Sequence, residues 1–303
     1  MGMRRFFVIL LYLLTLLSFS IKLLNPFGPT ILPISFILKG DVGKEIDVSF
    51  WKSPEEAVAA VKAAKANFYI LPITLGANLY NKGFDLVLLG VHEWKVFYLV
   101  ARGKIPSLKD LKGRKIYVTH SRGTVLDVLL RYFLERSGMK PDVDVKLVYA
   151  QPNEIVALFK AGKIEAAALP EPFATMALSS GGRIVLDFQK MWSEMTGLED
   201  RIPIAGLFTT KEMLKEHPLE SEYTELALWV STALMNEHRD AAVETASKFI
   251  KMPKRILENS LKRMVFYYVP IEKCKEDVER FLMVLHEKYP EGLSKVPDEG
   301  FYK

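Results

Sequence analysis

Apolar and polar residues alternate along the chain in short blocks that predict strands separated by helices. Residues 108–178 contain three β-type runs (115–118, 145–148 and 166–169), separated by two runs with helical spacing, and a third helix is expected from Glu171. Strands that alternate with helices of this length are typical of βαβ units and a parallel sheet. Ligands of such sheets gather at the carboxyl ends of the strands, where the next helix begins.

The rest of the chain extends this pattern. Further strands are expected at 21–24, 46–50, 68–71, 86–91, 96–100, 181–188 and 204–209. Ser53 followed by Glu56 is the capping-box signature of a helix start. Residues 191–201 have an irregular, mixed polarity. From Lys211 the pattern is helical nearly to the end, with helices expected at 219–237, 240–250, 253–263 and 271–288. Two α/β units followed by a helical layer are therefore predicted.

The N-terminus has the pattern of a secretory signal peptide. Residues 1–5 are basic, residues 6–19 form an almost unbroken apolar run, and Ser18 and Ser20 offer small side chains for cleavage. The run is shorter than the ~18–20 residues that a membrane-spanning helix needs. We expect residues 1–20 to direct export, so that the protein works outside the cytoplasm, in the periplasm or on the outer face of the cell membrane. The alternatives are an uncleaved membrane anchor and a buried first element.

Composition and missing motifs exclude several classes of function. The 303 residues have a net charge of +5, with acids and bases interspersed, so no nucleic-acid footprint stands out. The single Cys274 excludes an internal disulfide and a cysteine-based zinc site. No glycine-rich nucleotide loop, Gly-x-Ser-x-Gly elbow or His-Glu-x-x-His motif occurs. We therefore expect no metal and no cofactor, and we predict a protein that is not an enzyme.

The strongest candidate for ligand binding is the helix start after the strand at 115–118. It carries Ser121, Arg122, Gly123 and Thr124 ahead of an apolar helix. Free backbone N–H groups and the helix dipole at such a start suit a carboxylate, sulfonate or phosphate. The two hydroxyls and the guanidinium would add further donors. The alternative is an ordinary capped helix with Arg122 in solvent.

Three other places carry side chains suited to a ligand. The turn formed by Phe27, Gly28 and Pro29 could present an aromatic face and a bare backbone, or be a plain turn. Trp94 lies between two expected strands and could be a stacking platform or a hydrophobic plug. Glu171, two residues before Phe173, stands at a helix start, where the dipole favours an acid whatever the function. Each of these interpretations stays open at the level of the sequence.

Four stretches together resemble a known class of proteins. They are residues 107–116, residues 161–173, residues 71–83 and residues 296–302. The chain is similar, over essentially its whole length after the signal peptide, to extracytoplasmic substrate-binding proteins of ABC transporters. Within that family it resembles the nitrate/sulfonate/taurine class, which includes binders of thiamine-type pyrimidine precursors.

This resemblance implies an α/β fold of the two-lobed periplasmic binding protein type (type II). Each lobe would hold a mostly parallel sheet flanked by helices, with the ligand cleft between the lobes. We expect lobe one at 21–97 plus 209–303 and lobe two at 98–208. The two crossing strands are expected near 97–102 and 204–208.

The resemblance also implies which residues contact the ligand. These are Phe27, Gly28, Pro29 and Thr30 in the first loop, Pro72 and Thr74 at a helix start, and Ser121 to Thr124. Many sulfonate and taurine binders have Gly-Ser where this chain has Ser121-Arg122-Gly123-Thr124, which counts against taurine or alkanesulfonate specificity.

The resemblance implies a role in transport. We expect a monomer that captures a small organic ligand, anionic or heteroaromatic, by hinge closure and delivers it to an ABC permease in the membrane. One alternative is an enzyme of the same fold that acts on a small aromatic or pyrimidine-type substrate. The signal peptide and the absence of a cysteine cluster argue against it. The other alternative is a ligand sensor held by an N-terminal membrane anchor.

Overall fold

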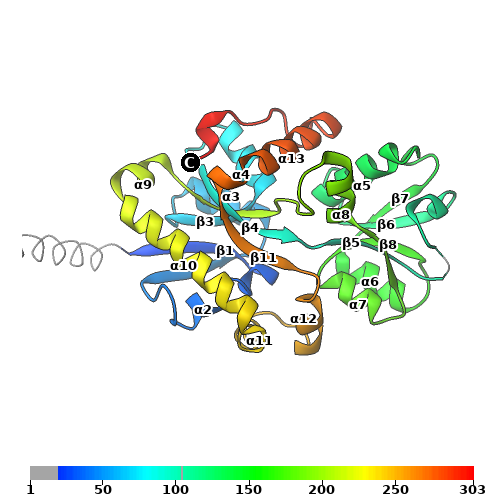
Figure 1. Cartoon of the computed structure of the whole chain (residues 1–303), viewed down its shortest axis with the longest axis horizontal. Helices are drawn as coiled ribbons and strands as arrows, with labels where there is room; N and C mark the ends of the chain where they lie inside the picture. Colours follow the sequence, from blue (N-terminus) through cyan, green and yellow to red (C-terminus); the bar gives the residue numbers. More distant parts are fainter. Residues whose placement is uncertain (1–19, 104) are drawn as a thin grey trace, which may run out of the picture.

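The chain forms two α/β lobes that lie side by side (Figure 1). The computed structural model describes residues 20–103 and 105–303. Apart from Ser20, the predicted signal peptide lies outside these residues and stays a prediction. No helix in the described part of the chain is long and apolar enough to cross a membrane.

The sheet of the first lobe has six strands in the order β11-β4-β10-β3-β1-β2. Their bounds are β1 Ile21–Pro26, β2 Ile46–Trp51, β3 Phe68–Pro72, β4 Val87–Lys95, β10 Ala205–Thr209 and β11 Val265–Pro270. Strand β1 is parallel to β2 and β3, whereas β10 is antiparallel to both β3 and β4. Strand β4 therefore runs in the direction of β1 and β3, and all three carboxyl ends lie at the same edge of the sheet.

The sheet of the second lobe has five strands in the order β7-β6-β8-β5-β9. Their bounds are β5 Phe97–Ala101, β6 Lys115–Thr119, β7 Lys146–Ala150, β8 Ala166–Pro170 and β9 Arg183–Asp187. Strands β6, β7 and β8 are parallel, and β5 is antiparallel to β8 and β9. Both sheets are mixed, with most strands running one way, so the predicted α/β fold class is confirmed.

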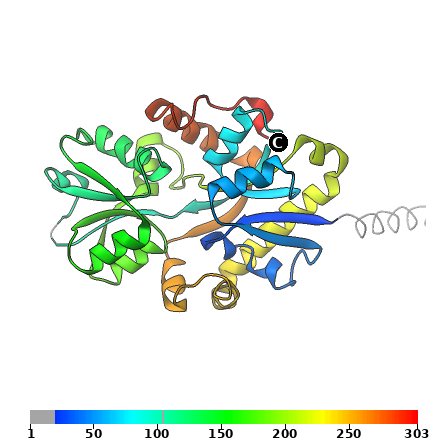
Figure 2. The same ribbon diagram turned by 180° about the vertical axis from the view of Figure 1, so that it is seen from behind.

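Helices cover both sheets and join the lobes (Figures 1 and 2). Those before β5 are η1 Pro29–Ile31, α2 Ser35–Leu38, α3 Pro54–Lys62 and α4 Ile73–Asn81. The second lobe contains η2 Leu108–Leu111, α5 Val125–Arg136, α6 Pro152–Lys160, α7 Phe173–Leu178 and α8 Phe188–Thr196. The C-terminal layer consists of α9 Lys211–Glu216, α10 Pro218–Glu237, α11 Arg239–Ala246, α12 Lys254–Ser260, η3 Ile271–Lys273, α13 Lys275–Lys288 and η4 Glu299–Phe301.

Apolar side chains on the two faces of each sheet explain why the helices pack where they do. One face of the first sheet carries Leu23, Ile70 and Leu207, which form a buried cluster with Ile37 of α2 and Leu228 of α10. Removing such side chains from water is the main favourable contribution to folding. Helix α13 packs against α5 of the second lobe, and α12 packs against α7. The C-terminal layer therefore bridges the two lobes.

The chain passes between the lobes twice, and one crossing differs from its predicted place. The first crossing joins β4 to β5 around residues 95–97, close to the prediction. The second was expected at 204–208, inside a second lobe of 98–208. Residues 205–209 instead form β10, which pairs with β3 and β4 in the first sheet, so this crossing comes earlier. An apolar strand buried on both faces has the same sequence pattern in a crossing and in a sheet centre.

Two elements were missed in the sequence. Strand β11 (Val265–Pro270) forms an edge of the first sheet, in the gap between the helices expected at 253–263 and 271–288, where no strand was expected. Its sequence, VFYYVP, is rich in β-branched and aromatic residues, which was the available signal. Helix α8 (Phe188–Thr196) occupies much of the region expected to be irregular. Asp187 starts it, because its carboxylate accepts hydrogen bonds from the amides of Gln189 and Lys190.

Candidate functional site

The starts of helices α4 and α5 face each other across a cavity between the lobes. The cavity has a volume of about 320 Å³. Its lining residues come from α4 and the end of β3, from α5 and from the C-terminal segment: Pro72, Thr74, Asn78, Gly123, Thr124, Val125, Val128, Leu285, Tyr289, Gly292 and Leu293. Four residues predicted to contact ligand, two from each lobe, are therefore brought together.

The C-terminal segment closes one side of this cavity. The side-chain amide of Asn78 donates a hydrogen bond to the carbonyl of Gly292 at 2.8 Å. Gly123 has φ +84°, and a Cβ added there would lie 2.2 Å from the ring of Tyr289. Glycine is thus required at 123 both for its backbone conformation and for the close approach of this ring.

Substitution of Gly123 tests this contact between the lobes. We expect Gly123→Ala to lower the free energy of unfolding by about 1 kcal/mol from the left-handed backbone alone, and by more if Tyr289 is displaced. Chemical denaturation checks the loss. Gly138→Ala, at φ +80° with open space around its added Cβ, is the matched control and should show only the backbone effect. Equal losses in the two variants would mean that the Tyr289 contact is unimportant.

A carboxylate of the chain itself already accepts a hydrogen bond at the start of α5. The carboxylate of Asp127 is buried and accepts a hydrogen bond from the amide of Gly123 at 2.8 Å. It also accepts from Arg131 at 3.0 Å and from the Tyr149 hydroxyl at 2.8 Å. The amide N–H of Gly123, one of the groups expected to bind an anion, therefore already has an acceptor within the chain. The prediction of an anion site here now depends on the neighbouring side chains.

Those neighbours are open to solvent. The side chain of Arg122 is 68% exposed, and its guanidinium lies 3.8 Å from the carboxylate of Asp142. The hydroxyl of Thr124 donates to the carbonyl of Ser121 at 3.0 Å. Ser121 and Arg122 do not line the 320 Å³ cavity, but they directly precede Gly123, which does. Their predicted contact with ligand stays a prediction.

The loop after β1 lies outside the cavity between α4 and α5. Thr30 is buried, and its hydroxyl donates to the carbonyl of Pro26 at 3.2 Å. Phe27 is 42% exposed and meets Phe50 edge-on, with ring centroids 5.9 Å apart. Gly28 precedes the short helix η1, which starts at Pro29. These four predicted residues do not line the cavity between α4 and α5.

Trp94 is a buried packing residue of the hinge in this structure. It belongs to β4, is completely buried, and its indole N–H donates to the carbonyl of Tyr267 at 2.8 Å. Its ring stacks on Tyr267, and the guanidinium of Arg201 lies 4.6 Å from its centroid. Arg201 also pairs with the buried Asp277 of α13. The cluster ties both crossings to the C-terminal layer, which fits the plug rather than the platform interpretation.

Glu171 likewise has partners within the chain. Its carboxylate is buried and pairs with Arg263 at 2.5 Å, and its other oxygen accepts from the amide of Thr175 at 2.9 Å. Arg263 also contacts the Thr175 hydroxyl, and its carbonyl accepts from Tyr98 at 2.6 Å. Glu171 thus anchors the α12–β11 connection to the second lobe. Phe173, the first residue of α7, packs against the core of that lobe.

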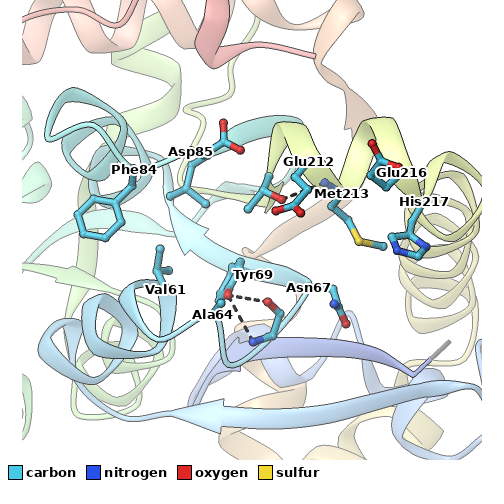
Figure 3. A pocket seen from close by; sticks show the side chains of 13 residues that line it. Val61, Ala64, Asn67, Tyr69, Phe84, Asp85, Glu212, Met213, Glu216 and His217 are labelled. Carbon is cyan, nitrogen blue, oxygen red and sulfur yellow. Dashed lines mark hydrogen bonds between the residues drawn. The ribbon is translucent and has the colours of Figure 1, made fainter.

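A larger cavity, of about 580 Å³, lies at the opposite edge of the first sheet (Figure 3). Asn67 and Tyr69 at the start of β3, and Glu212 and Met213 of α9, are among its lining residues. The Tyr69 hydroxyl donates a hydrogen bond to the carbonyl of Ala66 at 2.6 Å. Because parallel sheets bind ligands at the carboxyl ends of their strands, the smaller cavity is the better candidate.

Sequence reasoning missed the C-terminal contribution to the site. Asn78, Tyr289 and Leu293 line the cavity, yet Tyr289 and Leu293 follow the helix expected at 271–288, and no contact with ligand was predicted for them. No local pattern indicates that a helix end more than 150 residues away reaches Gly123. Within the described residues, no group of acidic, histidine and cysteine side chains could hold a metal ion.

Known proteins that match this chain are binding proteins and parts of import systems. A model of the NMT1-like family matches residues 37–263. A candidate aliphatic sulfonates-binding protein of Escherichia coli (strain K12) is 33% identical over 108 residues, covering 34% of this chain and 33% of that protein. The nitrate import ATP-binding protein NrtC of Synechococcus elongatus is 41% identical over 59 residues, 20% of this chain and 9% of its own length. The matches thus span a third or less of these relatives.

Solved structures match over nearly the whole chain. An ABC transporter structure from Parabacteroides distasonis has a TM-score of 0.80 at 25% identity, covering 94% of this chain and 98% of that one. The periplasmic aliphatic sulphonate binding protein SsuA of Escherichia coli has a TM-score of 0.74 at 19% identity, with 93% and 90% covered. At that identity the likeness shows the fold alone, which is the periplasmic binding protein fold.

Proposed function

Because this chain belongs to the NMT1-like family, we propose that it is an extracytoplasmic solute-binding protein that delivers a small organic ligand to an ABC permease. The observation that carries the proposal is the cavity between the starts of α4 and α5, which belong to different lobes. A site divided between two lobes that are joined by two short crossings is suited to capture by closure. The family match and the binding proteins among the relatives support the same role.

The mechanism is a shift between open and closed arrangements of the lobes. A ligand held by groups from both lobes contacts all of them only when the lobes are closed, so it binds that state more tightly. The difference in affinity between the two states sets how far the population shifts. The closed form would then dock on a permease in the membrane. A monomer suffices for this mechanism, and export by the N-terminal segment, cleaved or retained as an anchor, would place it outside the cytoplasm.

The ligand we propose is small and carries an acidic or heteroaromatic group. The cavity is lined by apolar side chains with a few polar ones, Thr74, Asn78 and Thr124. Apolar walls with a few fixed polar groups are typical of sites for small organic molecules. Mass spectrometry of compounds released from the purified full-length protein tests the proposal. A stoichiometric small molecule is expected; a catalytic turnover of candidate aromatic or pyrimidine substrates would contradict it.

Arg122→Ala tests the predicted anion contact. We expect ligand affinity to fall by about tenfold or more, the value of one hydrogen bond to a charged group, with little change in unfolding free energy because the side chain is 68% exposed. Isothermal titration with the released ligand measures the change. Arg136→Ala, on an exposed arginine at the far end of α5, is the control. Unchanged affinity in Arg122→Ala would show that this arginine is merely solvated.

A further inference from the structure

The second sheet has one edge at the boundary between the lobes and one edge that faces away from it. Strand β5 starts at the boundary, so its end at Ala101 lies at the far edge, where it pairs with Ala166 of β8 and with Arg183 of β9. Strands β6 and β7 are parallel to β8 and therefore also begin at the far edge. This edge forms the right-hand end of the molecule in Figure 1.

The far edge carries positive charge that the chain does not neutralise. Its acidic residues are already engaged: Asp144 pairs with Lys112 at 3.1 Å, Glu165 pairs with Arg114 at 2.6 Å, and Asp110 accepts a hydrogen bond from a backbone amide at 3.0 Å. Six exposed basic side chains remain without an ion pair among the described residues. We call these six the basic edge: Lys109, Lys115, Lys146, Lys160, Lys163 and Arg183. Because the whole chain has a net charge of only +5, its charge is distributed very unevenly.

Two lysines of the basic edge stand side by side. Lys115 and Lys146 are the first residues of β6 and β7, and the register of the two strands pairs them with each other. Neighbouring strands lie about 4.8 Å apart, and paired residues lie on the same face of the sheet. Like charges at such facing positions destabilise a sheet. An anion supplied from outside the chain would remove this repulsion.

Exposed apolar side chains lie among these charges. Val143, three residues before β7, is 79% exposed, more than any other large apolar side chain of the described chain. Ile184, the second residue of β9, is 40% exposed. Basic residues together with exposed apolar ones suit the interface of an anionic membrane. The exposed aromatic side chains of the described chain, Phe27 and Trp229, belong to the first lobe, so the basic edge offers bases no stacking platform.

We propose that the basic edge docks on the surface of a membrane that contains anionic phospholipids. Its lysines and its arginine neutralise lipid phosphates, and Val143 enters the headgroup region. This contact is separate from solute capture, because the cavity between α4 and α5 lies at the opposite edge of the second sheet. Strand β1 starts at the other end of the molecule (Figure 1). With the N-terminal segment retained as an anchor, both ends would be held and the long axis would lie along the membrane.

A fluorescent probe on the basic edge tests the contact whatever the N-terminal segment does. The only cysteine of the chain, Cys274, is buried, so Val143→Cys in the full chain can be labelled selectively with an environment-sensitive fluorophore. We expect its emission to shift to the blue on vesicles of equal parts phosphatidylcholine and phosphatidylglycerol, and not on phosphatidylcholine alone. The same label on Asn153→Cys, an exposed position in the first turn of α6 at the opposite edge of the lobe, is the control and should not shift.

Removal of the two facing lysines tests the role of charge. In the labelled protein, Lys115→Gln combined with Lys146→Gln should raise the anionic lipid concentration that gives half of the shift by about thirtyfold. At about 1 M salt, where charges are screened beyond about 3 Å, the shift should disappear. Lys251→Gln combined with Lys254→Gln removes the same charge from exposed positions at the start of α12 and should leave the shift unchanged.

Several results would overturn the inference. They are no shift on anionic vesicles, equal shifts on neutral and anionic vesicles, and a shift that survives the loss of Lys115 and Lys146. A shift produced by a DNA duplex but not by anionic vesicles would also overturn it and would assign the basic edge to nucleic acid. Without vesicles, Tm of the Lys115→Gln and Lys146→Gln double variant should be no lower than that of the unchanged protein, because the two lysines repel each other; a fall in Tm would show that they stabilise the fold and would count against a docking role.

Discussion

Arg263→Ala should lower the free energy of unfolding by about 3–5 kcal/mol, the usual cost of removing one partner from a buried ion pair. Its guanidinium lies 2.5 Å from the carboxylate of Glu171, whose side chain is fully buried while that of Arg263 is mostly so. Without the arginine, Glu171 keeps only the amide of Thr175 as a donor. Because Arg263 joins the α12–β11 connection to the second lobe, the loss also loosens the packing of the lobes. Urea denaturation measures the change.

Two companion variants separate the pair from its surroundings. Arg255→Ala, on an exposed arginine of α12, should change the unfolding free energy by less than about 0.5 kcal/mol. Replacing both Glu171 and Arg263 by methionine should recover most of the loss, because apolar residues of similar volume avoid the unpaired buried charge. A loss below about 1 kcal/mol in Arg263→Ala would show that the pair behaves like a surface salt bridge.

Between pH 4.5 and pH 8, the free energy of unfolding of Glu93→Gln should rise by about 3 kcal/mol relative to that of the unchanged protein. Burial raises the pKa of Glu93 from 4.5 to about 7 in the folded protein. The folded state therefore holds this proton more tightly than the unfolded chain does. Stability contributed by the protonated form is present below pH 4.5, is lost as the pH rises, and is gone above about pH 7. Glutamine does not titrate and removes this dependence.

Comparing the two proteins at each pH removes the effect of the neighbouring His92. Burial lowers the pKa of His92 to about 3, so its contribution changes in the opposite direction below its ordinary value of 6.5. This contribution is present in both proteins and cancels in the difference. Urea denaturation of the ligand-free chain at several pH values measures it. A difference that is constant with pH would mean that Glu93 ionises as it does in water.

Most of the fold could be predicted because the sequence repeats one local pattern. Alternating strands and helices identified the α/β class, and the motif stretches identified the family and the two-lobed fold, both now confirmed. Strand β11 was missed because it lies among helices and its six residues were too few to break that pattern. The place of β10 could not be decided locally, because sheet membership depends on pairing with β3 and β4.

The candidate site could be predicted only where a strand end and a helix start coincide. Pro72, Thr74, Gly123 and Thr124 satisfy that rule, and all line the cavity. Tyr289 reaches the cavity from α13 through tertiary packing alone. For Trp94 the sequence could not decide, because a single tryptophan between two strands is compatible both with a stacking platform for a ligand and with a packed core residue.

The most direct test of solute capture by both lobes is a thermal-shift titration of the full chain. The compounds are alkanesulfonates, nitrate, aromatic acids, pyrimidines, flavins and their amine-bearing counterparts. We predict that at least one compound raises Tm in a saturable way, because a ligand that binds only the folded state stabilises it. The same compound should have no effect on Gly123→Val, whose side chain would collide with Tyr289 at the cavity wall. If no compound gave a saturable shift, or if Gly123→Val responded like the unchanged protein, binding between α4 and α5 would be contradicted.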